Sequence, residues 1–129
     1  MPRLLLDTHA FLWFVTEDPK LSGPAQRTIA AGGNEPLLSA ACVWEIVIKV
    51  SVGRLPIPAP LDSFIPEQLS INRIALLPIE LRNLFEIARL PLHHRDPFDR
   101  LLIAQALVES IPIISADPAF DQYPIERIC

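Results

Sequence analysis

Hydrophobic residues in this chain form short continuous runs that alternate with longer segments of mixed polarity. Continuous apolar runs bounded by turn or polar residues are typical of buried strands. Such runs predict strands at residues 3–6, 36–38, 73–77, 112–115 and 125–128. The intervening segments predict helices at residues 10–14, 25–31, 40–52, 61–70 and 79–90, and another that begins at residue 97. Strands alternating with helices predict an α/β fold with a mainly parallel sheet covered on both faces.

The most distinctive pattern marks the start of the helix at residue 97. Asp96 is predicted to be its N-cap, and Asp99 is its third residue. On a helical wheel Asp99 stands above Ile103 and Ala106 on the apolar face, whereas Gln105 lies on the opposite side. A carboxylate that faces the core requires a cation or hydrogen bonds. Asp99 therefore needs an explanation beyond helix capping.

Length and composition indicate the class of protein. The chain has 129 residues, half of them hydrophobic, which suits one domain over residues 1–129. Its two cysteines, Cys42 and Cys129, suggest neither a disulfide framework nor a cysteine-rich zinc site, as in a reducing cytoplasm. No apolar run reaches the roughly 18 residues of a membrane helix, and no signal-peptide layout opens the chain. We expect a soluble cytoplasmic protein without a membrane partner.

The charge balance excludes some functions and leaves others open. A formal net charge of −4 argues against a protein that grips nucleic acid with its whole surface. Carboxylates gathered at one site would account for such a deficit, and a bound divalent metal would reverse the local sign where a phosphate binds. The glycines at 32–33 lack the spacing of dinucleotide-binding and P-loop motifs. The hypothesis that the protein is an enzyme with a nucleotide cofactor therefore loses its main support.

Four acidic residues are candidates for such a site. Asp7 and Asp117 each follow a predicted strand, where open α/β sheets bind ligands. Glu45 lies in the helix at 40–52, and Asp99 lies at the start of a buried helix. Oxygen ligands without cysteine suit the hard cations Mg²⁺ and Mn²⁺. Their joint placement predicts metal-assisted phosphoryl chemistry.

Simpler interpretations of single residues remain open at this point. Asp7 or Thr8 would also serve as a helix cap. Glu45 and Lys49 have the i,i+4 spacing of a surface ion pair. Alternatively, Glu45 points inward with the apolar residues of its face, and Lys49 is a phosphate contact or its counter-charge. Arg95 and Arg100 are candidate contacts for phosphates, or else solvated charges beside a cap.

Four stretches of the chain also carry a family resemblance. They are residues 4–9 (LLLDTH), 39–45 (SAACVWE), 94–100 (HRDPFDR) and 115–117 (SAD). Together they resemble PIN-domain proteins, specifically VapC-type ribonuclease toxins, nearly from end to end. The most specific part is the string DPFDRLLIAQA at 96–106.

The resemblance implies a three-layer α/β/α fold and Mg²⁺- or Mn²⁺-dependent endonucleolytic cleavage of RNA. It also implies neutralisation by a co-expressed VapB-like antitoxin, and we expect a homodimer. Matching the motifs residue by residue gives an acidic site, catalytic and metal-binding, of Asp7, Glu45, Asp99 and Asp117. Thr8 and Ser115 become supporting hydroxyl groups. The match leaves Asp96 ambiguous, and we take Asp99 as the ligand and Asp96 as an N-cap or supporting acid, because only Asp99 needs an explanation beyond capping. The candidate substrate contacts beside this site are Lys49, Arg95 and Arg100.

Two other functional classes compete with the nuclease. One is a non-catalytic PIN-like module that binds RNA or protein. The retention of all four acids argues against this module. The other is a receiver-type phosphoacceptor domain, in which Mg²⁺ and clustered aspartates also meet. Glu45 in mid-helix and the absence of a matching lysine after a late strand argue against the receiver.

Overall fold

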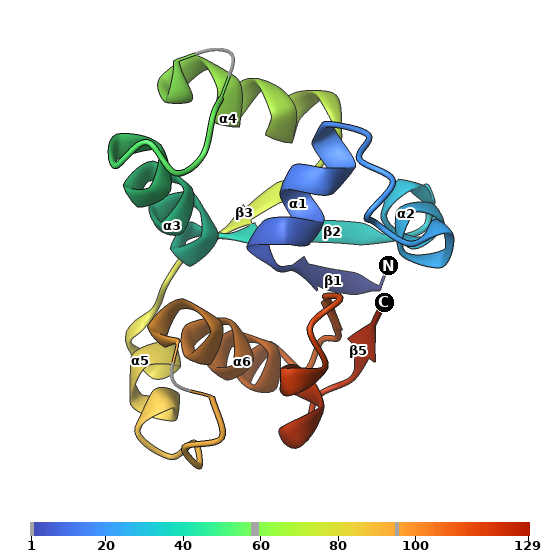
Figure 1. The fold of residues 1–129 in the computed structure, drawn as a ribbon. Coiled ribbons are helices and arrows are strands. Elements are labelled where there is room, and N and C mark those ends of the chain that lie inside the picture. The colour runs from blue at the N-terminus through green and yellow to red at the C-terminus, as the bar shows by residue number, and fades with distance from the viewer. Residues whose placement is uncertain (1, 58–59, 95) are drawn as a thin grey trace.

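The centre of the fold is a parallel sheet of five strands in the order β3-β2-β1-β4-β5 (Figure 1). The computed structural model describes residues 2–57, 60–94 and 96–129. The strands are β1 (Arg3–Leu6), β2 (Glu35–Ser39), β3 (Ala75–Leu77), β4 (Ile113–Ile114) and β5 (Arg127–Ile128). The middle strand β1 and its neighbour β4 form the buried centre of the sheet; Leu5 and Leu6 of β1 are fully inaccessible to solvent.

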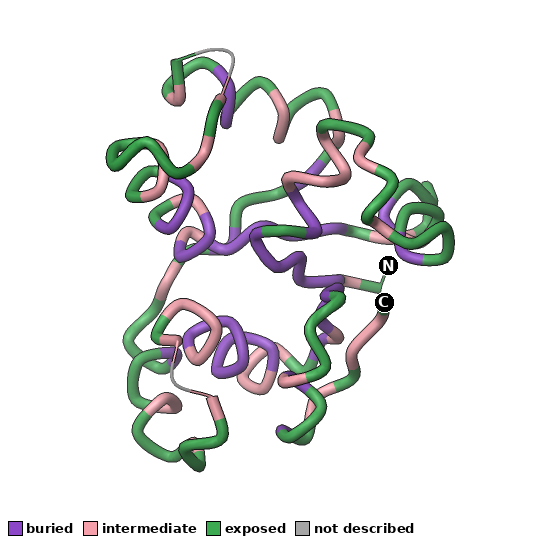
Figure 2. The backbone as a smooth tube through the Cα atoms, viewed as in Figure 1, coloured by how far each residue is buried: buried purple, intermediate pink, exposed green. Residues whose placement is uncertain are grey.

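Helices form the outer two layers. They are α1 (Thr8–Val15), α2 (Gly23–Ala30), α3 (Ala40–Ser51), α4 (Leu61–Ile71), α5 (Leu81–Ile87), α6 (Pro97–Glu109) and the 3₁₀ helix η1 (Pro118–Gln122). Figure 1 shows α1 in front of β2 and β3, α4 at the top of the view, and α5 and α6 at the lower left. Buried segments concentrate along the central strands and α6 (Figure 2). The expected α/β/α layering is therefore present. No helix in the described ranges is long and apolar enough to cross a membrane.

The chain changes direction across the sheet beside β1. The first three strands in sequence order run outward as β1, β2 and β3, whereas β4 returns to the other side of β1. Leu6 pairs with Ile114, and the Asp7 N–H donates to the Ile114 carbonyl oxygen at 3.1 Å. The carboxyl ends of β1 and β4 therefore lie side by side, at the switch point where open α/β sheets bind ligands.

Helix α6 is buried on two sides, which the sequence pattern did not predict. Gln105 was expected opposite the apolar face, yet it is completely buried because α5 packs on that side. Its Nε2 donates to the Pro78 carbonyl oxygen at 3.2 Å. Its Oε1 is a buried acceptor without a hydrogen-bond partner among the described residues. The helical wheel placed Gln105 away from the apolar stripe, but it could not show that a second helix covers that side.

The strands predicted at 112–115 and 125–128 are confined to β4 and β5, and local backbone signals shorten two further elements. The helix expected at 79–90 is confined to α5, since Glu80 and Asn83 form a capping box that sets its start. Leu81 and Phe85 on this helix are 68% and 60% exposed, so they lie outside the core. The strand expected at 73–77 begins only at Ala75, because Arg73 adopts a left-handed conformation with φ of 55° after α4.

Candidate active site

The four acids predicted as a site line one pocket of about 140 Å³ at the carboxyl ends of β1 and β4. The pocket also contains Thr8, His9, Lys49, Asp96 and Phe120. The acids come from four separate parts of the chain, and the fold brings them together. Their positions are thus those that the sequence led us to expect, while their roles stay predictions.

Asp7 is both a helix cap and a pocket residue. It follows β1, and its Oδ1 accepts a hydrogen bond from the Ala10 N–H at 2.7 Å, which starts α1. Its residue exposure is 7%. Burial raises the pKa of this carboxyl, while hydrogen bonds from Ser115 and Ala10 partly oppose the rise. The capping interpretation and the site interpretation therefore hold together for Asp7.

Glu45 points inward from α3 rather than across the protein surface. One carboxylate oxygen, Oε1, accepts from the Thr8 hydroxyl at 2.6 Å. The other, Oε2, lies 2.8 Å from Lys49 Nζ. The i,i+4 ion pair is real, but Glu45 is only 8% exposed, so the interpretation as an ordinary surface pair is wrong. Lys49 supplies the counter-charge that a buried carboxylate requires.

Asp96 and Asp99 make different contacts at the start of α6. Asp96 Oδ1 accepts from the N–H groups of Phe98 at 2.8 Å and Asp99 at 3.1 Å, so it is the N-cap. Asp99 is partly buried among other carboxylates. Burial, and then the negative charge of Asp96, raise the pKa of Asp99 to about 7. Asp96 is therefore the N-cap, as predicted, but it also lines the pocket beside Asp99, and the choice of Asp99 as the metal ligand stays a prediction.

Asp117 follows β4 and caps η1. Its Oδ1 accepts from the Ala119 N–H at 2.9 Å, and its own N–H donates to the Ser115 hydroxyl oxygen at 3.0 Å. Its side chain is 47% exposed, compared with 24% for Asp99 and 11% for Glu45. Ser115 itself is buried and serves both Asp117 and Asp7. The pocket therefore opens to solvent at Asp117 and closes toward Asp7.

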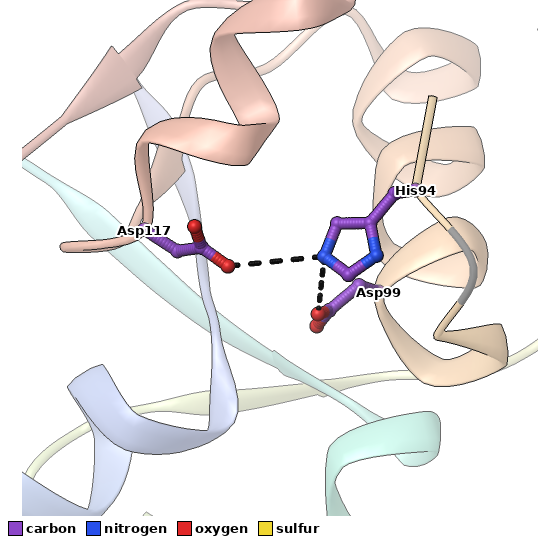
Figure 3. Close-up of side chains that lie close together, drawn as sticks. All are labelled: His94, Asp99 and Asp117. Atoms are coloured by element: carbon purple, nitrogen blue, oxygen red, sulfur yellow. Dashed lines mark ion pairs between the residues drawn. The ribbon is translucent and has the colours of Figure 1, made fainter. Parts of the chain in front are cut away.

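Sequence reasoning missed His94, which reaches the pocket acids Asp99 and Asp117 from the loop before α6. Its Nε2 lies 2.9 Å from Asp99 Oδ2 and 3.8 Å from Asp117 Oδ2 (Figure 3). The signal was available, because His94 opens the same HRDPFDR string that supplied Asp96 and Asp99. What the string did not indicate was direction, since loop residues have no periodicity from which to read a face.

The candidate substrate contacts have different surroundings. Lys49 lines the pocket while it pairs with Glu45. The guanidinium of Arg100 donates to the carbonyl oxygens of Ile87 at 3.1 Å, Pro91 at 3.1 Å and His94 at 3.4 Å. Arg100 thus ties down the loop that precedes α6. Arg95 lies outside the described residues.

The donor set fits a hard divalent cation. Carboxylate oxygens of Asp99 and Asp117 lie within 4.8 Å of each other and of a ring nitrogen of His94, and Asp7 and Glu45 complete a pocket rich in carboxylates. Oxygen donors of this kind suit Mg²⁺ or Mn²⁺. The raised pKa values of Asp7 and Asp99 show that the carboxylates are held where ionisation is unfavourable without a positive partner. A cation would supply that partner.

Comparison with known proteins agrees with the fold. The sequence is 47% identical to ribonuclease VapC16 of Mycobacterium tuberculosis over 36 residues, which are 28% of this chain and 26% of that relative. The match thus spans about a quarter of the curated relative. Two solved structures resemble nearly the whole chain. One is VapBC2 from Rickettsia felis bound to a promoter DNA fragment, with a TM-score of 0.71 and 15% identity over 98% of this chain and 97% of that chain.

The other is VapBC-1 from nontypeable Haemophilus influenzae, with a TM-score of 0.67 and 16% identity over 98% of this chain and 96% of that chain. At such identities these structures establish the fold, and they confirm the predicted PIN-like architecture. The family model described as the PIN domain matches residues 4–126. Because this match covers almost the whole sequence, the chain belongs to the PIN domain family.

Proposed function

We propose that this protein is a divalent-metal-dependent endoribonuclease that acts as the toxin of a toxin-antitoxin pair. The observation that carries the proposal is the convergence of Asp7, Glu45, Asp99 and Asp117 on one pocket of a PIN domain. The curated relative, a ribonuclease by name, adds support over the segment that it matches. The alternative, a non-catalytic binding module, has no need of crowded carboxylates whose mutual repulsion costs stability.

In this proposal the four carboxylates hold Mg²⁺ or Mn²⁺, which supplies an activated water and neutralises charge on the phosphate when it is bound. The surrounding residues fix the carboxylates beforehand. Thr8 and Lys49 hold the two oxygens of Glu45, and Ser115 hydrogen-bonds to Asp7. Such outer contacts keep ligands oriented, so little rearrangement is needed during the reaction.

Basic side chains beside the pocket are the proposed contacts for RNA phosphates. Lys49 is 36% exposed, so its ammonium group is open to a second anion besides Glu45. Arg100 is also a proposed phosphate contact, although its guanidinium already donates hydrogen bonds to carbonyl oxygens before α6 and is less free to move. Arg95 is proposed from its place in the sequence alone.

The purified protein should cleave single-stranded or loop RNA when Mg²⁺ or Mn²⁺ is present, because the carboxylates need a cation before an anionic substrate enters. The measurement is the appearance of defined RNA ends, mapped by sequencing, with and without excess chelator. RNA that is bound but not cleaved would favour the binding module, and equal cleavage in excess chelator would contradict the metal-dependent mechanism.

The same acidic pocket leads us to propose a VapB-like antitoxin as partner. Its C-terminal segment should place an Arg or Lys against the carboxylates, because a cation there competes with the metal. We expect one equivalent of the co-expressed partner to suppress RNA cleavage, and excess Mn²⁺ to restore part of it. The check is an RNA cleavage assay on the copurified pair. A partner that copurifies while the nuclease stays fully active would refute this inhibition.

We also propose that the protein forms a homodimer. The support is the row of exposed apolar side chains on α5, where Leu81, Leu84 and Phe85 are 68%, 45% and 60% exposed. Exposed apolar patches on a soluble domain commonly mark contacts between proteins.

A further inference from the structure

His94 reaches the pocket from a loop that a buried tyrosine holds in place. Tyr123, which is 3% exposed, follows η1. Its hydroxyl oxygen accepts from the backbone N–H groups of His93 at 3.1 Å and His94 at 2.9 Å, and it donates to the Pro91 carbonyl oxygen at 2.9 Å. One hydroxyl thus satisfies three main-chain groups of the loop, and the position of the His94 backbone is set by a contact outside the pocket.

The ring of His94 is held as well. The Asp96 N–H donates to Nδ1 at 3.2 Å, and the ring lies against Phe120 with 6.0 Å between centroids. Phe120 and Tyr123 belong to or follow η1, the same element that Asp117 caps. This short segment therefore supplies one acid of the pocket and also fixes the loop on the opposite side.

The hydrogen bonds identify the tautomer of His94. Because Nδ1 accepts from an N–H group, it carries a lone pair, and the ring proton resides on Nε2. Nε2 then donates to Asp99 Oδ2 at 2.9 Å, while Asp117 Oδ2 at 3.8 Å is beyond hydrogen-bonding distance. A histidine that binds metal through Nε2 normally donates from its other nitrogen to an acceptor. His94 has the reverse arrangement.

We propose that His94 is a positioning residue of the acidic site: Tyr123 fixes its loop, and its Nε2–H holds one oxygen of Asp99 so that the other oxygen is presented to the metal. The proposal rests on the proposed function. A hydrogen-bond donor outside the set of metal ligands suits this task, since it fixes the orientation of a carboxylate. It contrasts with the opposite wall of the pocket, where Lys49 neutralises Glu45.

The test measures Mn²⁺ binding by electron paramagnetic resonance on the isolated protein, alongside RNA cleavage. His94→Ala should weaken Mn²⁺ binding by about 10–100-fold, the usual effect of losing an outer contact to a metal ligand. His94→Gln should recover much of the loss, because its amide places a donor near the position of Nε2. Tyr123→Phe should weaken binding severalfold, although it removes a hydroxyl that does not touch the acids. Leu92→Ala is the control, because its side chain is 68% exposed in the same loop and its substitution leaves the N–H contacts of His93 and His94 to Tyr123 in place.

A second measurement uses the wild-type protein, so it does not require that any variant folds. Nitrogen-15 NMR of the metal-free wild type should show His94 as the neutral Nε2–H tautomer. The Nδ1–H tautomer, or a His94→Ala protein that binds Mn²⁺ as tightly as wild type, would overturn the positioning role and leave the nuclease proposal intact. Wild-type protein that neither binds Mn²⁺ nor cleaves RNA would overturn both.

Discussion

Replacing Asp7 by asparagine should abolish RNA cleavage while the fold survives. The substitution removes one negative charge from the most enclosed part of the pocket. Asparagine caps helices about as well as aspartate, so its side-chain oxygen can still accept from the Ala10 N–H. Loss of an outer contact to a metal site typically costs about 10–100-fold, so loss of a direct ligand should cost at least about 100-fold.

The measurement is the initial rate of cleavage in Mn²⁺, with circular dichroism to establish that the variant is folded. Asp18→Asn is the matched control, since it removes an equal charge from a carboxylate that accepts only a local hydrogen bond from the Lys20 N–H. Its rate should equal that of the wild type. An Asp7→Asn protein that retains more than about a tenth of the wild-type rate would show that Asp7 is a structural cap and no more.

Replacing Asp99 by asparagine should change stability in opposite directions with and without metal. The pKa of Asp99 is raised to about 7 from the ordinary value of 3.8, first by burial and then by the negative charge of Asp96. Between those values the folded chain binds more protons than the unfolded chain, so metal-free stability falls as the pH rises from about 4 to about 7 and then levels off. The asparagine variant lacks this penalty. In chelator at pH 8 it should melt about 3–6 °C higher than wild type, and the difference should shrink toward pH 5.

Mn²⁺ should reverse the order of the two proteins. Metal that binds only the native state adds about 2.7 kcal/mol when its free concentration is 100 times its dissociation constant. The wild type should gain this stabilisation, whereas Asp99→Asn should lose most of it. Thermal melts at pH 5 and pH 8, each in chelator and in Mn²⁺, measure all four conditions. A variant that melts lower in chelator at pH 8 and responds normally to Mn²⁺ would show that Asp99 is a structural cap.

Sequence patterns gave most of the fold because they report on local structure. Continuous apolar runs located β1 and β4, and the carboxyl ends of parallel strands are neighbours by topology, so Asp7 and Asp117 were expected to meet. Gln105 could not be placed, because its burial depends on α5 packing against a face that looks polar in isolation. His94 could not be predicted for a different reason. The position of its loop depends on a hydrogen bond to Tyr123, which lies 29 positions further along the chain.

Three acids at the pocket, Asp7, Asp96 and Asp117, cap the starts of α1, α6 and η1. The two α-helices therefore point the positive ends of their macrodipoles at the same place, each equivalent to roughly half an elementary charge. This field offsets part of the repulsion among the carboxylates and favours an incoming phosphate group, even though the chain carries a net charge of −4. Lengthening the loops at these helix starts would withdraw that field while leaving every carboxylate in the sequence.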